Sequence, residues 1–170
     1  MRCRVESWTV DTRSELERAQ DFRDIFALVK RVVERRLGIR RAGLMLVLAD
    51  EPAFVLAYHG IGTNFIVLNR RVISALVGRG APQTELKSYL FTVLLHEYLH
   101  SLGYVDESET RRLVMEITRS EFGDDHPAFR FAVKPLGEDE VRALLNQGQI
   151  GPSEPRLVRH FDDENLTYVA

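Results

Sequence analysis

The residues whose types and spacing can support chemistry are His96, Glu97 and His100, in the sequence His-Glu-Tyr-Leu-His. Residues four apart lie on one face of an α-helix, so the imidazoles of His96 and His100 can reach a single metal ion. Glu97 projects about 100° further round the helix, where its carboxylate can accept a proton without binding the metal. The spacing therefore predicts a metal site with a general base beside it.

The residues around this motif predict a buried helix over 85–102, with Thr84 as its N-cap. Burying Glu97 beside two histidines is costly unless another charge compensates it, and a dication does so. Apolar residues run nearly all the way round the segment, as is typical of a helix inside a domain: Leu90, Phe91, Val93, Leu94, Leu95, Leu99 and Leu102.

Length and composition are those of one ordinary domain. The 170 residues can bury a sizeable core, and a net charge of −2 gives no general attraction to nucleic acid or to an anionic membrane. Cys3 is the only cysteine, which excludes an internal disulfide and a thiolate cluster and favours a reducing compartment. We find no signal peptide and no membrane-spanning segment, so we expect a soluble, cytoplasmic protein.

The remaining hydrophobic patterns predict an α+β fold. Residues 1–148 are expected to form one domain, and residues 149–170 a loosely docked tail with at most one strand. Gly103 has the position of a left-handed residue that ends the motif helix and turns the chain back, which can carry Asp106 towards the metal. The expected strands are 4–10, 44–49, 53–58 and 64–69, the last an edge strand, and the other expected helices are 16–37, 71–77, 107–122 and 138–147.

From His96 to Asp106 the sequence reads HExxHxxGxxD and resembles the zincin clan of metallopeptidases. The resemblance implies a twisted mixed sheet of about four strands, backed by a long helix and by the motif helix. It also implies that the edge strand, here residues 64–69, lines the cleft and pairs with extended substrate. The Asp in the last position is similar to the small snapalysin-type metzincins, although Met115 lies in a predicted helix rather than in a Met-containing turn.

This resemblance implies that His96, His100 and Asp106 bind one zinc ion and that Glu97 is the base. Other third ligands remain open, because Asp106 with Glu109 also forms a capping pattern for the next helix. The gluzincin members of the clan use a glutamate from a downstream helix, so the alternatives are Glu116, Glu121 and, from a loop, His126. His59 and His160 are expected at the surface, and Tyr104 is expected either to pack or to donate a hydrogen bond to an oxyanion.

The function expected is that of a zinc metallopeptidase, an endopeptidase rather than an exopeptidase, acting on peptides or unfolded proteins through a zinc-bound water activated by Glu97. The first alternative is a catalytically silent binding or regulatory module whose tail covers the cleft. The second follows from the segment Leu99 to Tyr104, which is similar to the zinc endoribonucleases that mature bacterial ribosomal RNA. Those enzymes have histidine at the position of Asp106 and usually glycine at that of Glu97, and balanced charge argues against nucleic acid.

Overall fold

The computed structural model describes residues 11–148 and 150–163 of the chain. Within these residues the chain forms seven helices and four strands, so the α+β class predicted from the sequence is confirmed. In chain order the elements are α1 (Thr12–Arg18), α2 (Phe22–Leu37), β1 (Met45–Ala49), β2 (Ala57–His59), β3 (Phe65–Asn69), α3 (Arg70–Gly78), α4 (Gln83–Ser101), α5 (Glu107–Phe122), α6 (Pro127–Val133), α7 (Glu138–Gln147) and β4 (Arg156–Val158).

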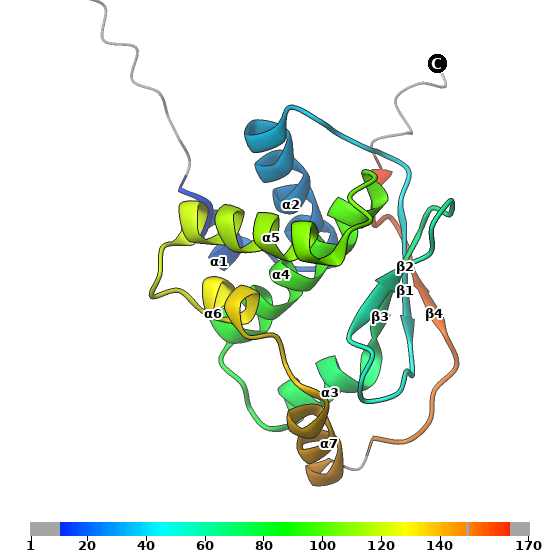
Figure 1. Ribbon diagram of the computed structural model, residues 1–170. Helices are drawn as coiled ribbons and strands as arrows, with labels where there is room; N and C mark the ends of the chain where they lie inside the picture. The colour runs from blue at the N-terminus through cyan, green and yellow to red at the C-terminus, as the bar shows by residue number, and fades with distance from the viewer. Residues whose placement is uncertain (1–10, 149, 164–170) are drawn as a thin grey trace, which may run out of the picture.

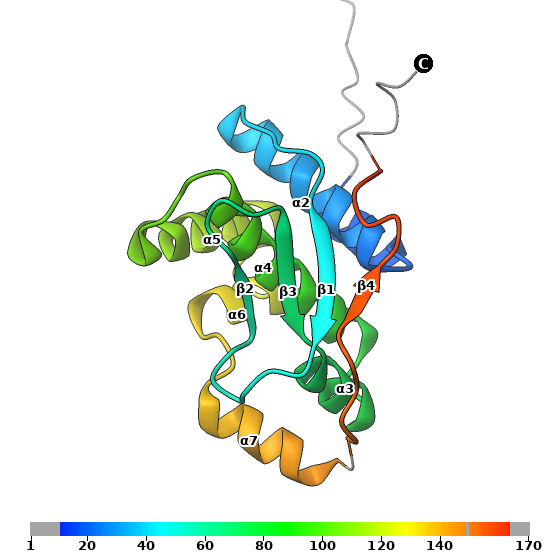
Figure 2. The ribbon, with the colours of Figure 1, turned by 90° about the vertical axis from the view of Figure 1, so that its right-hand side faces the viewer.

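The four described strands form one mixed sheet in the order β2-β3-β1-β4, which Figure 2 shows face on. β1 and β3 are parallel, whereas β2 pairs antiparallel with β3, and β4 antiparallel with β1. The expectation of an edge strand at residues 64–69 is wrong, because β3 lies between β2 and β1. Four of the five β3 residues are buried, and the edge strand on this side is β2.

β2 is shorter than the strand expected over residues 53–58. The amide of Val55 donates a hydrogen bond to the carbonyl of Pro52, which closes a turn and delays the strand until Ala57. Asn69 holds this turn in place, since its side-chain amide donates to the carbonyls of Glu51, Pro52 and Val55. The apolar run over residues 53–58 is non-helical as predicted, but its first half forms a turn rather than a strand.

The long helix expected over residues 16–37 is divided into α1 and α2. The side chain of Asp21 accepts a hydrogen bond from the Asp24 amide, so Asp21 is the N-cap of a new helix. A capping aspartate competes with continuation of the preceding helix, because it satisfies amides that would otherwise bond to that helix. Asp11 caps α1, while the strand expected over residues 4–10 lies outside the described residues.

The second half of the chain follows the hydrophobic pattern more closely. α5 and α7 have the predicted bounds, and α3 extends one residue further at each end. α4 begins at Gln83, so Pro82 and not Thr84 occupies the N-cap position. α6 was not expected; it begins with Pro127 in its first turn, where a missing backbone amide costs nothing, and the His126 side chain caps it.

α4 lies at the centre of the fold, with the sheet on one side and α2, α5 and α6 around it (Figure 1). Its surface is apolar in nearly every direction, and Phe91, Leu94, Leu95, Tyr98 and Leu99 are fully buried. Each of these side chains contributes roughly 1.5–3 kcal/mol of burial free energy, so this helix is held firmly. None of the described helices combines the length and the hydropathy that crossing a membrane requires.

The described part of the tail is docked more closely than the sequence led us to expect. β4 extends the sheet beside β1, and the Phe161 ring stacks on Phe26 with ring centres 4.3 Å apart. Asp162 lies 2.8 Å from the ammonium of Lys30, and both side chains are almost completely buried. A buried ion pair and a stacked ring need close packing, so Phe161 and Asp162 anchor the described tail on the domain, although residues 151–157 are exposed; residues 164–170 lie outside the described residues.

Candidate functional site

α4 presents one polar stripe to a cleft and buries the rest of its surface. The stripe follows helical spacing, because residues three, four and seven apart share a face. It brings the motif residues into the cleft, as the sequence predicts for His96, Glu97 and His100. Along the helix the cleft-lining residues are Tyr89, Thr92, Val93, His96, Glu97 and His100.

The two histidines point their Nε2 atoms at each other across a distance of 3.0 Å. The Nδ1 atom of His100 lies 2.6 Å from the carbonyl oxygen of Tyr104. A carbonyl can only accept, so Nδ1 of His100 carries a proton, and in the neutral ring the lone pair then lies on Nε2. Burial lowers the pKa of His96, although Glu107 opposes this. Burial therefore favours the neutral form of His96, which is the form that can bind a metal.

Glu107, the first residue of α5, completes the cluster. Its Oε1 lies 3.3 Å from Nε2 of His96, and its Oε2 lies 3.2 Å from Nε2 of His100. Arg111, one turn further along α5, donates from Nε to the same Oε1 at 2.9 Å. Burial favours the protonated acid, but the hydrogen bond and charge of Arg111, together with the charge that the histidines carry when protonated, outweigh it and lower the pKa of Glu107. The third group at the histidines is thus an ionised carboxylate.

These three side chains fit a single zinc ion. Their ligand atoms all lie within 4.8 Å of one another. Ligand atoms at tetrahedral zinc are about 3.3 Å apart, since each bond is about 2.0–2.1 Å long. The observed separations of 3.0–3.3 Å match that spacing. Two histidines and one carboxylate also form a known catalytic set that leaves a fourth position for water or substrate.

Asp106, the third ligand expected from the sequence, lies next to this cluster but does not join it. Its Oδ1 accepts a hydrogen bond from the amide of Glu109 at 2.7 Å, so it is the N-cap of α5. The capping alternative for Asp106 and Glu109 is therefore confirmed. Because the capping carboxylate folds back onto its own helix, the next side chain, Glu107, is the one that faces the histidines. In this structure Glu107, and not Asp106, is the carboxylate grouped with the two histidines.

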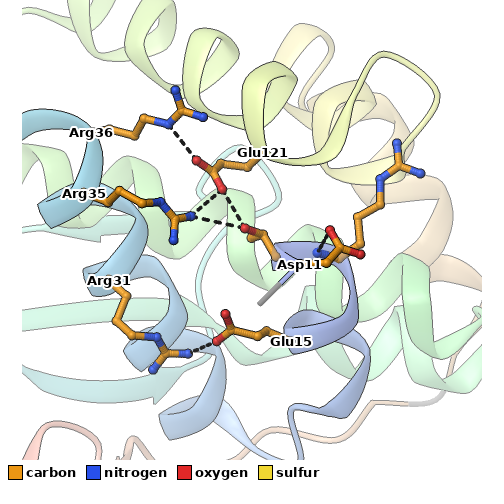
Figure 3. Close-up of polar contacts among 8 residues, drawn as sticks. Asp11, Glu15, Arg31, Arg35, Arg36 and Glu121 are labelled. Carbon is orange, nitrogen blue, oxygen red and sulfur yellow. Dashed lines mark hydrogen bonds and ion pairs between the residues drawn. The ribbon is translucent and has the colours of Figure 1, made fainter. Parts of the chain in front are cut away.

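The two other glutamates considered as ligands are engaged elsewhere. Glu116 is exposed and pairs with Arg112 on the same helix. Glu121 joins three elements. Arg35 and Arg36 of α2 donate to its carboxylate (Figure 3), and the hydroxyl of Thr12 in α1 donates to it too. Each of the three donor atoms lies 2.6 Å from the carboxylate oxygen. Glu121 therefore stabilises the helical layer and is not part of the cluster of His96, His100 and Glu107.

Of the remaining histidines, His126 and His160 make structural contacts and His59 lines the cleft. His126 accepts the Ala128 amide at Nδ1, 3.2 Å away, and stacks on Phe122, so it caps α6. His160 is exposed and pairs with Asp163. His59, expected at the surface, ends β2 and lines the cleft.

Glu97 is only 6% exposed and lies beside the cluster. Burial raises its pKa to about 8, with a further contribution from the charge of Glu107, while the backbone amide of His59 opposes the rise. A carboxylate at this depth binds a proton readily, and a nearby cation would favour its ionised form. The environment of Glu97 therefore suits a group that takes up a proton and gives it back.

The cleft itself has a volume of about 470 Å³, which is enough for a side chain and part of a backbone. β2 and the turn before it form one wall, and α5, α6 and the segment after α6 form the others. Its lining combines the charged groups described above with apolar side chains, among them Leu56, Val93, Phe131 and Leu136. No residue of the described tail, 150–163, lines it, since β4 is at the opposite edge of the sheet from β2.

The sequence did not reveal three residues that line the cleft: Glu107, Arg111 and Tyr89. Glu107 directly follows Asp106, the ligand expected from the sequence. Because the first residue of a predicted helix is uncertain by about one position, Glu107 could have been considered as well. Tyr89 lies about two helical turns before His96, which places it on the same face. Tyr104, considered as an oxyanion donor, does not line the cleft; its contribution is the carbonyl that holds His100.

The chain matches no protein-family model, and neither a curated protein nor a solved structure shows significant similarity to it.

Proposed function

We propose that this protein is a zinc-dependent metallopeptidase that cleaves peptides or unfolded proteins, with zinc held by His96, His100 and Glu107. The observation that carries the proposal is the placement of two imidazole Nε2 atoms 3.0 Å apart beside the Glu107 carboxylate. Facing lone pairs and a carboxylate repel one another, so a cation between them is the natural complement. The resemblance of His96 to Asp106 to the zincin clan supports the same proposal.

Bound zinc would supply Lewis acidity, which polarises a carbonyl and activates water. The protein's own part is proton transfer: Glu97 takes a proton from the attacking water and returns it to the leaving amine. Its buried position keeps its proton affinity high enough for both steps. Arg111 and the Tyr104 carbonyl act indirectly, because they hold Glu107 and His100 in place.

Peptide is a better substrate than RNA for this cleft. Arg111 is the only arginine or lysine among the described residues that line it, and that arginine is already paired with Glu107. Contacts to nucleic acid depend on several cationic groups along the phosphate backbone. The exposed edge strand β2 on the cleft wall instead suits main-chain pairing with an extended peptide.

The test measures zinc content and peptide hydrolysis in the same preparation. We expect about one zinc per chain by mass spectrometry and cleavage of an unfolded protein that stops when a chelator is added. Glu97→Gln should keep its zinc and lose nearly all turnover, since the amide is isosteric but cannot accept the proton. Absence of zinc, or full turnover in Glu97→Gln, would refute the proposal.

A further inference from the structure

Arg111 of α5 is a cationic side chain in a cleft whose other charged residues are acidic. No other arginine or lysine of the described residues lines the cleft, and its two carboxylates are those of Glu97 and Glu107. The Arg111 side chain is 60% exposed, so a molecule that enters from solvent can reach its guanidinium. Among the described residues, Arg111 is therefore the one permanently positive group that such a molecule meets in the cleft.

Arg111 uses only part of its donor set on Glu107. Its Nε donates to Oε1 of Glu107 at 2.9 Å, and this contact holds the guanidinium beside the metal ligands. The two terminal nitrogens, Nη1 and Nη2, make no hydrogen bond to any of residues 11–148 and 150–163. Together they form the end-on fork that matches the two oxygens of a carboxylate. The fork is thus free, although Arg111 already belongs to an ion pair.

The next residue of α5, Arg112, is arranged differently. It pairs with Glu116 one turn further along the helix, and it does so through a terminal nitrogen, Nη1, at 2.7 Å. Its side chain is 57% exposed, much like that of Arg111, but it does not line the cleft. Arg112 therefore uses its terminal group for a pair at the surface, whereas Arg111 keeps that group for the cleft.

Zinc would leave the charge of Arg111 without compensation. The Glu107 carboxylate lies 3.3 Å from Nε2 of His96 and 2.9 Å from Nε of Arg111, so the arginine and the proposed metal share it. A dication offsets the charges of the two carboxylates in the cleft, those of Glu97 and Glu107, and the charge of Arg111 is then left over. A zinc-loaded cleft is therefore complementary to one additional negative charge.

We infer that the Nη1 and Nη2 fork of Arg111 binds a carboxylate of the peptide substrate close to the bond that is cleaved. The inference rests on the proposed function and names its substrate class. Because Nε of Arg111 already contacts a proposed metal ligand, Glu107, the fork lies just outside the ligand set. Each residue of a peptide spans about 3.8 Å, so the carboxylate belongs one or two residues from the scissile bond. A C-terminal carboxylate and an acidic side chain both provide this chemistry.

The cleavage test uses the zinc-loaded full chain and two sets of peptide pairs whose members differ only by one carboxylate. In the first set the C-terminus is a free acid or an amide, one or two residues beyond the scissile bond. In the second set both ends are blocked, and Glu or Gln occupies each of the two positions on either side of that bond in turn. In at least one set we expect kcat/KM for the acid to exceed that for its uncharged partner by about tenfold, mainly through KM. That set identifies the source of the carboxylate.

Variants of the two neighbouring arginines assign the preference to Arg111. Arg111→Gln should bring the ratio of acid to uncharged peptide close to one, and Arg111→Lys should retain only part of it, because lysine keeps the charge but lacks the planar fork. Arg112→Gln is the matched control and should leave the ratio unchanged. Arg111 also holds Glu107, so each ratio is taken within one preparation, where a partial loss of zinc cancels. A preference that survives in Arg111→Gln overturns the inference.

A binding test separates this inference from the proposed function. Calorimetry on Glu97→Gln, with and without Arg111→Gln, measures the affinity for the same peptide pairs without turnover. Tighter binding of the acid that Arg111→Gln abolishes supports the carboxylate subsite even if the wild type cleaves nothing. Cleavage by the wild type with no preference for the acid in any pair overturns the subsite alone, whether or not the Arg111 variants fold. Equal binding of both members of every pair, or binding of neither, overturns the subsite as well.

Discussion

The Nδ1 atom of His100 and the carbonyl oxygen of Tyr104 are 2.6 Å apart, and this contact fixes the orientation of the His100 ring beside His96 and Glu107. It depends on the chain reversal after α4, where Gly103 has a φ of 103°. The same carbonyl accepts a hydrogen bond from the Thr110 hydroxyl in α5. One backbone group thus joins the end of the motif helix to the helix that supplies Glu107.

Replacing Gly103 by alanine should weaken zinc binding, because a residue with a Cβ avoids this backbone conformation. The added Cβ meets nothing within 4 Å, so the effect is backbone strain of about 1–3 kcal/mol rather than a clash. If the strain moves the Tyr104 carbonyl, zinc affinity should fall by roughly 10- to 100-fold, as for other lost partners of a ligating histidine. Competition with a fluorescent chelator measures this.

Gly80 offers a matched control for that variant. It also has a positive φ, 74°, and no atom near an added Cβ, but it lies in the loop before α4. Gly80→Ala should lose comparable stability and keep its zinc affinity. Equal zinc affinity in both alanine variants would show that the turn at Gly103 does not position His100.

Glu107→Gln should reduce zinc affinity far more than Asp106→Asn. The first change removes the charge of a proposed ligand, and the loss should exceed the roughly 10- to 100-fold expected for an outer partner. The second keeps a good N-cap, since asparagine caps helices about as well as aspartate, so zinc affinity should change little. Zinc titration of the two variants decides between them, and the reverse order would restore Asp106 as the ligand.

The sequence predicted the part of the site that depends on one helix. The placement of His96, Glu97 and His100 follows from helical spacing alone, because any helix there puts the two histidines on one face and Glu97 about 100° round from His96. The third group depends on which residue caps the next helix, and Asp106 and Glu107 differ in role by a single position. That choice is made by hydrogen bonds and by the approach of α5 to α4, which no local pattern contains.

The fold, too, was predicted where it depends on local pattern and was missed where it depends on distant segments. Helices with strong hydrophobic periodicity, such as α5 and α7, were predicted to the residue. The position of β3 inside the sheet was not, because strand order is set by pairing between segments distant in sequence. The break between α1 and α2 had a local signal, since Asp21 and Asp24 form a capping pattern, but the periodicity across it obscured the cap.

Asp162→Asn should destabilise the protein by about 3 kcal/mol or more. The change removes a negative charge that faces the buried ammonium of Lys30, and breaking a buried pair from one side typically costs about 3–5 kcal/mol. Asp163→Asn is the neighbouring control. Its pair with Arg23 is partly exposed and should contribute at most about 1 kcal/mol. Urea unfolding measures both, and equal small losses would show that the tail is not anchored by Asp162.

Glu121 should make stability depend on acid pH through the contacts in Figure 3. Burial favours its protonated form, but the hydrogen bonds from Thr12 and Arg36 and the charge of Arg35 prevail and lower the pKa of Glu121 in the folded state. The unfolded chain, with the ordinary value near 4.5, then binds the proton more readily. The stabilisation is therefore complete above pH 4.5 and is lost as the pH falls towards the folded pKa.

Glu121→Gln should consequently lower the free energy of unfolding at pH 7, by roughly 1–3 kcal/mol as for other charged hydrogen bonds. The difference from wild type should shrink steadily below pH 4.5. Glu116→Gln, the same change on the exposed face of α5, should have little effect at either pH, and both variants should bind zinc as the wild type does. A difference that is constant between about pH 7 and about pH 3 would mean that Glu121 acts by packing rather than by its charge.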